Sequence, residues 1–291
     1  MIRNRLTQNA REVDIFLIKY LKKQDKSLLT NPMKYGVISG GKKIRSTVIF
    51  DVGKIFNLNK KKLINICASV ECIHSYSLIH DDLPCMDNDK IRRGKPATHI
   101  KFGEASAVLA GNSLLTLAFE IIADQNYLIN PKTKNEIIKS LAHCSGHTGI
   151  AGGQELDLTF ENKLKNLNQI INMQKKKTGK LFSFCFFSVG LLAKKSEKEK
   201  IFLRILGEEI GLLFQLADDF LDIKGSKTMV GKPIKKDNKK GKSTLINLLG
   251  YEKAYKYAQN LKKKILLKLK KHGKKASDLK DTIEFILGRN F

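Results

Sequence analysis

Four aspartates lie within nine residues of one another in the first third of the chain: Asp81, Asp82, Asp87 and Asp89. The chain has a formal net charge of +26, so acidic residues are scarce, and four carboxylates this close together repel one another unless a cation lies between them. Two consecutive arginines, Arg92 and Arg93, follow directly. Carboxylates next to paired arginines indicate a metal ion that is held beside an anionic group.

A second acidic cluster occurs in the stretch FQLADDFLDIKG at 214–225. Asp218 and Asp222 are four residues apart and therefore share one face of a helix, with Asp219 beside them. Apolar residues surround this cluster and predict a mostly buried helix, in which carboxylates need partners. Two such clusters indicate a Mg²⁺ site with several ions, because hard oxygen ligands and substrate phosphates suit that metal.

Helical periodicity recurs along almost the whole chain, and the sequence predicts one all-α domain over residues 1–291. A helix is expected at 63–83 and ends near Pro84, which disfavours a helical residue before it. On that helix His74 and Asp81 are seven residues apart, so they share a face about 10 Å apart along the axis. The loops are expected near residues 30–42, 84–104, 126–133 and 224–243.

Composition favours a folded protein of the cytoplasm. The N-terminus has no uninterrupted apolar stretch of the kind found in a secretory signal, and the five cysteines show no metal-binding spacing. The longest apolar run, at 181–193, is too short to span a bilayer and predicts a buried helix, so no stable membrane insertion is expected. Only eight of the 54 basic residues are arginine, and the lysines are spread along the chain in a way typical of solvated surfaces.

Several motifs in order resemble those of the trans-prenyl diphosphate synthases. The two aspartate-rich stretches DDLPCMDNDKIRRG and QLADDFLDIKG carry the resemblance, and GGKKIR at 40–45, GNSLL at 111–115, GGQELDL at 152–158, KTGKLF at 177–182 and GKST at 241–244 support it. The resemblance covers roughly residues 35–250. It implies an isoprenoid synthase-type bundle of about ten helices around a central cavity, and a homodimer.

The resemblance also implies a metal site for an allylic diphosphate. Three Mg²⁺ ions per active site are expected, and their predicted ligands are Asp81, Asp82, Asp87, Asp218, Asp219 and Asp222. The allylic diphosphate is expected to contact four basic residues, Arg92, Lys177, Lys232 and Lys242. Thr178 and Gln215 are expected near the reacting carbon, where they offer oxygen dipoles without a reactive base. The residues expected to be catalytic are Asp81, Asp82, Lys177, Thr178, Gln215 and Asp218.

A second substrate, isopentenyl diphosphate, is expected to bind without metal through Lys42, Arg45, His74 and Arg93. The expected reaction is ionisation of the allylic diphosphate, attack by the isopentenyl double bond and loss of a proton. By resemblance, Tyr76 forms the floor that limits chain length and the product is farnesyl diphosphate, with geranylgeranyl diphosphate as the alternative. Ideal helix geometry places Ser77 closer than Tyr76 to the face of Asp81, so spacing alone does not establish that floor.

Two other classes of protein fit the sequence less well. A P-loop is disfavoured, because position 43 is lysine where Ser or Thr is required and no apolar strand precedes the glycines. A basic nucleic-acid-binding protein is the non-enzyme alternative, and it rests on charge alone. It leaves both aspartate clusters unexplained, since carboxylates on a binding face would repel phosphate. No nucleic-acid partner is therefore expected.

Overall fold

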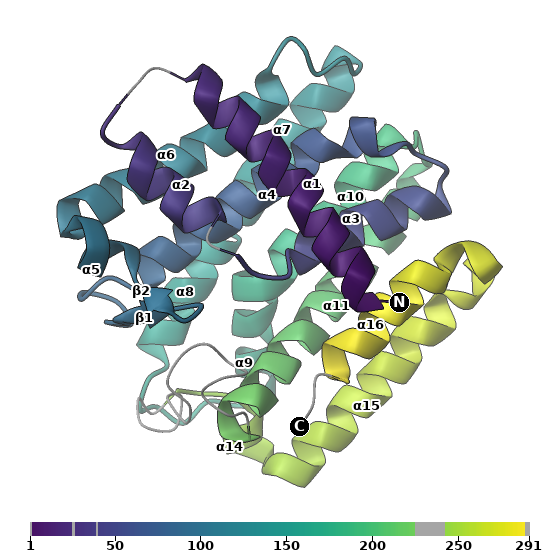
Figure 1. Ribbon diagram of the computed structural model, residues 1–291. Helices are drawn as coiled ribbons and strands as arrows, with labels where there is room; N and C mark the ends of the chain where they lie inside the picture. The colour runs from purple at the N-terminus through teal and green to yellow at the C-terminus, as the bar shows by residue number, and fades with distance from the viewer. Residues whose placement is uncertain (1, 25–26, 39, 225–241, 289–291) are drawn as a thin grey trace. The chain divides into compact units, whose positions relative to one another are not determined.

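A computed structural model describes residues 2–24, 27–38, 40–224 and 242–288, and these are almost entirely helical (Figure 1). The helices are α1 (Ile2–Lys23), α2 (Thr30–Ile38), α3 (Ile44–Ile55), α4 (Lys60–Asp81), α5 (Thr98–Phe102), α6 (Glu104–Ala123), α7 (Pro131–Ser145), α8 (Ile150–Thr159), α9 (Leu167–Gln174), α10 (Lys180–Leu192), α11 (Glu197–Lys224), α14 (Leu245–Leu249), α15 (Tyr251–Lys268) and α16 (Ser277–Leu287). A π-helical turn, η1 (Lys175–Gly179), joins α9 to α10, and a 3₁₀ helix, η2 (Lys270–Ala276), precedes α16. The prediction of an all-α protein is confirmed.

The chain divides into two compact units. The first comprises Met1–Phe50 and Asn59–Ile138, and the second comprises Asp51–Leu58 and Lys139–Phe291. The first aspartate cluster belongs to the first unit and the second cluster to the second unit. The prediction of a single domain over residues 1–291 stays a prediction.

Helix α4 forms the centre of the first unit and packs along α6. It begins after the N-cap Asn59, whose side chain accepts a hydrogen bond from the amide of Lys61 at 2.6 Å. Apolar side chains such as Ile66, Val70 and Ile73 are completely buried, so most of its circumference is inside the unit. Helix α4 is the element expected at 63–83, and it ends at Asp81, three residues before Pro84.

Helix α6 is the one described helix that is long and apolar enough to cross a membrane by length and composition. It is packed against α4 and α2, and a core helix of a soluble protein meets the same two criteria. Gly111 makes this packing possible, because a Cβ at that position would lie 2.1 Å from Nε2 of His80 on α4. His80 in turn forms a hydrogen bond with the carbonyl oxygen of Val108 at 3.1 Å.

The loop expected at 30–42 was wrong in part, because residues 30–38 form α2. Pro32 and Gly36 lie within this helix. Proline is tolerated in the first turn of a helix, where its missing amide leaves no internal bond unmade. Gly36 is required by close packing, since a Cβ there would lie 2.4 Å from Cδ1 of Ile79.

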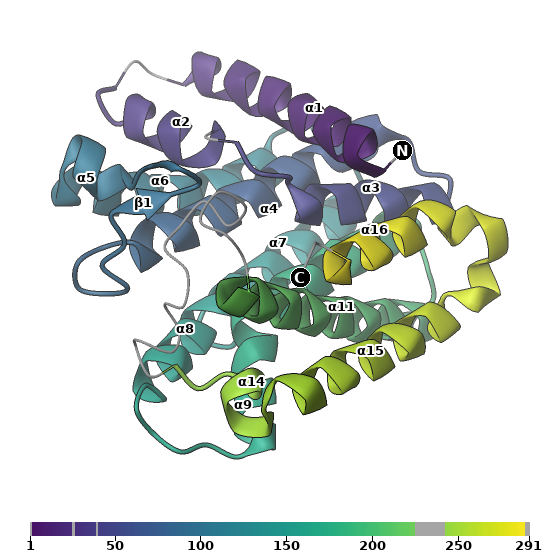
Figure 2. The same cartoon turned by 60° about the horizontal axis from the view of Figure 1, so that its bottom comes forward.

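The second unit has an aromatic core along α10. Phe182, Phe184 and Phe186 are fully buried, which confirms that the apolar run at 181–193 is an internal helix. Burial of each such side chain contributes about 2–3 kcal/mol. Helix α11 packs closely on α10 through Gly207, where a Cβ would lie 2.6 Å from the carbonyl oxygen of Phe182. Figures 1 and 2 both show α15 running beside α11.

Candidate active site

The first aspartate cluster lies where α4 ends and the chain turns back on itself. The amide of Asp87 donates to the carbonyl oxygen of Asp81 at 2.8 Å, and the amide of Asp89 donates to the carbonyl oxygen of Asp82 at 3.0 Å. The four residues between Asp82 and Asp87 form the turn. Asp81 and Asp87, which would not share a face of a continuous helix, are therefore brought together by the backbone after the helix ends.

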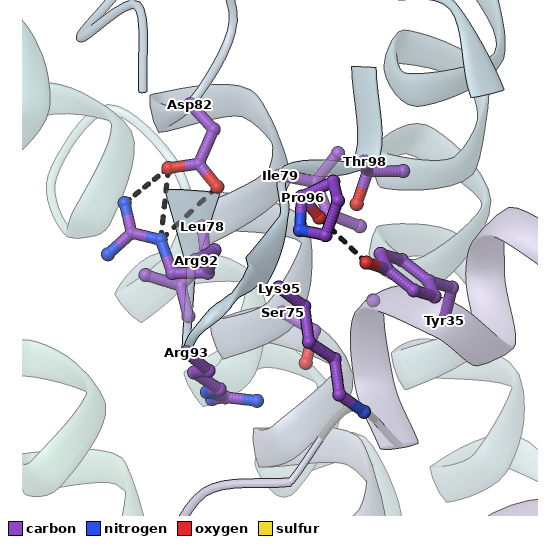
Figure 3. Close-up of a pocket in the computed structure, with 11 residues that line it drawn as sticks. Tyr35, Ser75, Leu78, Ile79, Asp82, Arg92, Arg93, Lys95, Pro96 and Thr98 are labelled. Carbon is purple, nitrogen blue, oxygen red and sulfur yellow. Dashed lines mark hydrogen bonds and ion pairs between the residues drawn. The ribbon is translucent and has the colours of Figure 1, made fainter. Parts of the chain in front are cut away.

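Asp82 is held by Arg92. Its carboxylate is 2% exposed, and Arg92 donates to it from both Nε, at 3.0 and 3.2 Å, and Nη2 (Figure 3). Arg92 Nη2 also lies 3.4 Å from Oδ2 of Asp89. The sequence predicted Asp82 as a metal ligand and Arg92 as a contact of the allylic diphosphate. In this structure the two groups bind each other, and both roles stay predictions.

Arg92 and Arg93 point in different directions from a short β-hairpin. The hairpin pairs β1 (Ile91–Arg92) with β2 (Lys95–Pro96) inside the region expected as a loop at 84–104. Arg93 has a φ of +53° and Gly94 a φ of +73°, and this left-handed turn separates the two side chains. Figure 3 shows Arg92 turned to Asp82, with Arg93 pointing away from it. Arg93 Nη1 instead donates to the carbonyl oxygen of Gly40 at 2.8 Å.

A small pocket lies behind the hairpin, between it and residues of α2 and α4 (Figure 3). Tyr35 closes one side, because its hydroxyl donates to the carbonyl oxygen of Pro96 at 2.7 Å. The pocket has about 20 Å³ of space, which is about enough for one water molecule. The pocket is too small to hold a substrate. Its lining residues show that the hairpin lies against α2 and α4.

The four residues predicted to bind isopentenyl diphosphate all belong to the first unit. Lys42 is exposed on the turn before α3, and Arg45 is 8% exposed on the first turn of that helix. The pKa of His74 lies well below its usual value, because burial and the nearby charges of Arg45 and Arg93 disfavour its protonated form. The structure thus brings His74, Arg45 and Arg93 into one electropositive group that suits an anion.

The second aspartate cluster lies near the C-terminal end of α11. Asp219 is 3% exposed and accepts hydrogen bonds from two neutral amides, Gln174 Nε2 at 2.9 Å and Gln215 Nε2 at 2.8 Å. Asp222 is 2% exposed, whereas Asp218 is partly exposed. Of the three predicted ligands on this helix, Asp218 has the most accessible side chain.

The π turn positions two further predicted residues. Thr178 Oγ1 donates to Gln215 Oε1 at 2.7 Å, so the structure brings together the two oxygen dipoles expected near the reacting carbon. Turns of this kind are rare and recur at functional sites. The amide of Lys180 donates to the carbonyl oxygen of Lys175, five residues earlier. Gly153 on α8 contacts the turn closely, because a Cβ there would lie 2.2 Å from the amide nitrogen of Lys177.

Asp157 is a residue to which the sequence assigned no role. Its carboxylate is 6% exposed, and Oδ2 lies 2.6 Å from Lys177 Nζ and 3.4 Å from Lys242 Nζ. Two lysines predicted to bind the allylic diphosphate therefore converge on one carboxylate. The motif GGQELDL contained the signal, since it includes an aspartate within an otherwise mostly uncharged stretch. The third predicted lysine, Lys232, lies outside the described residues.

Tyr76, the predicted floor, is 8% exposed on α4. Its ring packs edge-on against His80, with 5.7 Å between ring centroids. Burial and, to a smaller extent, the charge of Asp81 together raise the pKa of Tyr76 to about 12. Tyr76 thus lies within electrostatic reach of the first aspartate cluster, and its role in chain length stays a prediction.

The donor set of the first cluster fits magnesium. Within the described residues, no three His, Cys, Asp or Glu side chains converge closely enough to hold a metal ion by themselves. Asp81 and Asp87 nevertheless offer hard carboxylate oxygens, and the hydrogen bond between their backbones brings the two residues next to each other. Mg²⁺ usually takes only one or two carboxylates and completes its coordination with water and substrate phosphate, so such a pair is sufficient.

Comparison with known proteins identifies the family. The model of the polyprenyl synthetase family matches residues 26–286. The chain belongs to this family. Farnesyl diphosphate synthase of Escherichia coli is 40% identical over 263 residues, which are 89% of this chain and 88% of that protein. The family membership confirms the resemblance drawn from the motifs and the prediction of a prenyltransferase.

Two solved structures have the same fold. A FPP/GFPP synthase of Zymomonas mobilis, in its apo form, has a TM-score of 0.88 at 34% identity and covers 98% of each chain. A geranyltransferase of Helicobacter pylori, complexed with magnesium and isoprenyl diphosphate, has a TM-score of 0.83 at 32% identity and covers 99% of this chain and 96% of its own. These likenesses confirm the isoprenoid synthase-type fold.

Proposed function

We propose that this polyprenyl synthetase is a magnesium-dependent farnesyl diphosphate synthase, which extends dimethylallyl and geranyl diphosphate with isopentenyl diphosphate. One observation carries the proposal beyond the family. The hairpin directs Arg92 to the aspartate cluster and Arg93 to the GGKK turn (residues 40–43). Two adjacent arginines thus serve two different anion-binding elements, as a reaction between two diphosphates requires.

The two diphosphates have different needs. The allylic diphosphate leaves with the electron pair of its C–O bond, so its developing charge must be neutralised strongly. Magnesium, when bound by the aspartates, supplies Lewis-acid stabilisation of that leaving group. The isopentenyl diphosphate is retained in the product, and we propose that Lys42, Arg45 and Arg93 anchor it without metal, with neutral His74 beside them.

We propose that the second aspartate cluster binds the same allylic diphosphate as the first, through three Mg²⁺ ions in all. Lys177, Lys232 and Lys242 would contact that diphosphate directly. Thr178 and Gln215 would direct oxygen dipoles at the cation that ionisation leaves. The isopentenyl double bond then forms the new C–C bond, and the departing diphosphate accepts the proton that is lost. This arrangement requires one domain and a cavity that both clusters line.

We propose farnesyl diphosphate as the main product, with Tyr76 limiting chain length. The bulk of its ring on α4, five residues before Asp81, supports this proposal. Purified protein would be incubated with Mg²⁺, isopentenyl diphosphate and geranyl diphosphate, and the dephosphorylated products would be separated by length. A dominant fifteen-carbon alcohol is expected, and Tyr76→Ala is expected to shift it to twenty carbons or more. A twenty-carbon product from the wild type would favour the geranylgeranyl alternative.

We also propose that the protein works as a homodimer in the cytoplasm, without nucleic acid and without stable insertion into a membrane. Helix α6 supports the dimer, because its apolar residues Val108 and Leu109 are exposed at 39% and 54%. Sedimentation analysis is expected to give a dimer for the wild type. Leu109→Glu is expected to shift it toward the monomer, and a monomeric wild type would contradict the proposal.

A further inference from the structure

The GGKK turn has an unusual backbone. Gly40, Gly41 and Lys43 have φ values of +90°, +96° and +40°. Glycine adopts positive φ without strain, but a residue with a Cβ is disfavoured there by about 1–2 kcal/mol. The turn carries Lys42 and leads directly into Arg45, two of the residues proposed to bind isopentenyl diphosphate. A backbone of this kind persists only where surrounding contacts hold it.

Lys43 supplies one of these contacts. It is 5% exposed, and Nζ donates to the carbonyl oxygen of Val37 at 2.9 Å and lies 3.2 Å from Oδ1 of Asp14. A buried ammonium is unfavourable unless it is paired and hydrogen-bonded, and here both conditions are met. Asp14 belongs to α1, the N-terminal helix, for which the sequence showed no recognisable chemistry. Burial raises the pKa of Asp14, while the charge of Lys43 opposes that rise.

The opposite side of the turn is held by Arg93. Its Nη1 donates to the carbonyl oxygen of Gly40, and a Cβ on Gly41 would lie 3.0 Å from its Cζ. The first turn of α3 is held as well, since the buried carboxylate of Glu71 accepts from the hydroxyl of Ser46 at 2.7 Å and from its amide at 3.3 Å. The turn is therefore held by α1, α2 and the hairpin, and the start of α3 that follows it is held by α4.

We propose that Lys43, paired with Asp14 of α1, is a positioning residue for isopentenyl diphosphate. The inference rests on the proposed function and adds two residues to it. Lys43 does not itself bind the substrate, because its ammonium is buried against Val37 and Asp14. It holds the strained backbone in which Lys42 and Arg45 are presented together. Helix α1 thereby contributes a carboxylate to the organisation of a site that it does not line.

The test separates the two substrates. The KM for isopentenyl diphosphate is measured at saturating geranyl diphosphate, and the KM for geranyl diphosphate at saturating isopentenyl diphosphate. In Lys43→Met, the KM for isopentenyl diphosphate is expected to rise about 10-fold or more, with a change below twofold for geranyl diphosphate. The double variant K43M/D14N is expected to regain part of this loss, because it no longer leaves Asp14 without its cation.

The chain provides a matched control on the same helix. Glu12 forms an exposed ion pair with Lys60, with 2.7 Å between Oε1 and Nζ. Glu12→Gln and Lys60→Met remove the same chemical groups as Asp14→Asn and Lys43→Met. Both control variants are expected to keep the two KM values within twofold of the wild type, since an exposed pair contributes little.

Two results would overturn the proposal: an unchanged KM for isopentenyl diphosphate in Lys43→Met, or equal rises for both substrates. If Lys43→Met does not fold, Asp14→Asn takes its place as the test. In Asp14→Asn the KM is expected to rise about threefold for isopentenyl diphosphate and to stay unchanged for geranyl diphosphate. An unchanged value in Asp14→Asn would then overturn the proposal. Failure of the proposed function is a separate outcome, since the wild type would then show no condensation.

Discussion

Asp82 and Asp219, one aspartate from each cluster, have hydrogen-bond partners of opposite kinds. In the first, Asp82 is paired with a guanidinium that donates from two nitrogens. In the second, Asp219 accepts from two neutral glutamine amides, and Thr178 extends this chain of hydrogen bonds through Gln215. A charged partner neutralises its carboxylate, whereas amides orient a carboxylate and leave its charge in place. The two glutamine amides therefore fix the orientation of the Asp219 carboxylate, whereas Arg92 also offsets the charge of Asp82.

The largest effect is expected at Asp218, whose side chain is the most accessible of the three aspartates on α11. Asp218→Ala is expected to reduce kcat by about 10³-fold, comparable to the loss of a principal electrostatic group in an active site. Turnover is measured by incorporation of labelled isopentenyl diphosphate with Mg²⁺ present. EDTA is expected to abolish turnover in the wild type. Asp281→Ala, a change at an exposed site on α16, is the control, and activity of Asp218→Ala within twofold of it would contradict the assignment.

Stability should distinguish the two kinds of partner. Asp82→Asn leaves the partly buried Arg92 without a full counter-charge and is expected to lower the free energy of unfolding by about 2–3 kcal/mol. Asp219→Asn weakens hydrogen bonds to neutral amides and is expected to lower it by about 1 kcal/mol. Urea unfolding at pH 7 measures both values. Equal losses would show that the contrast between charged and neutral partners has no energetic basis.

Asp157 allows a comparison within the second unit. Asp157→Asn removes the charge that Lys177 and Lys242 share, so both ammonium groups are expected to lose their fixed positions. We expect kcat/KM for geranyl diphosphate to fall about 10-fold, with the KM for isopentenyl diphosphate unchanged. Steady-state kinetics with each substrate varied in turn measures this. A rise in the KM for isopentenyl diphosphate, with kcat/KM for geranyl diphosphate unchanged, would contradict the assignment of these lysines to the allylic substrate.

His74 is expected to change stability only with pH. Its pKa is lowered in the folded state by burial and by Arg45, so the unfolded chain takes up a proton near pH 6.5 that the folded protein does not. Stability from this group is present above that pH and is lost as the pH falls below it. Between pH 7 and pH 5 the expected loss is about 1–2 kcal/mol. His74→Gln should reduce the slope of unfolding free energy against pH, and an unchanged slope would contradict the shift.

Periodicity was sufficient to predict the long elements. Helix α4 and the internal helix at 181–193 follow from apolar spacing, because their environment is uniformly buried. Helix α2 was missed, since proline and glycine usually indicate a loop. Pro32 is accepted because it lies in the first turn of the helix, and Gly36 because the helix packs closely on Ile79 there. The hairpin was missed as well, because two-residue strands have no periodicity to detect.

The candidate site divides in the same way. Residue types and spacing predicted the aspartate clusters and the arginines, because such chemistry is rare in a lysine-rich chain. The sequence did not indicate that Arg92 would bind Asp82, since the partner of a guanidinium depends on tertiary structure. Lys43 was indistinguishable from the many other lysines, and only its buried ammonium and positive φ set it apart.

The π turn has a consequence for the phase of the helices around it. One additional residue in a turn rotates everything that follows by about 100° about the helix axis. A residue of α9 and a residue of α10 that are eight apart across Lys175–Gly179 therefore share a face, whereas seven apart is sufficient in an uninterrupted helix. Deletion of any one residue in this turn would restore an ordinary helical register. Phe182 and the rest of α10 would then keep their present neighbours. Conversion of the turn to an α-helix at its present length would instead rotate them by about 100° away from those neighbours, although no side chain of the core had been changed.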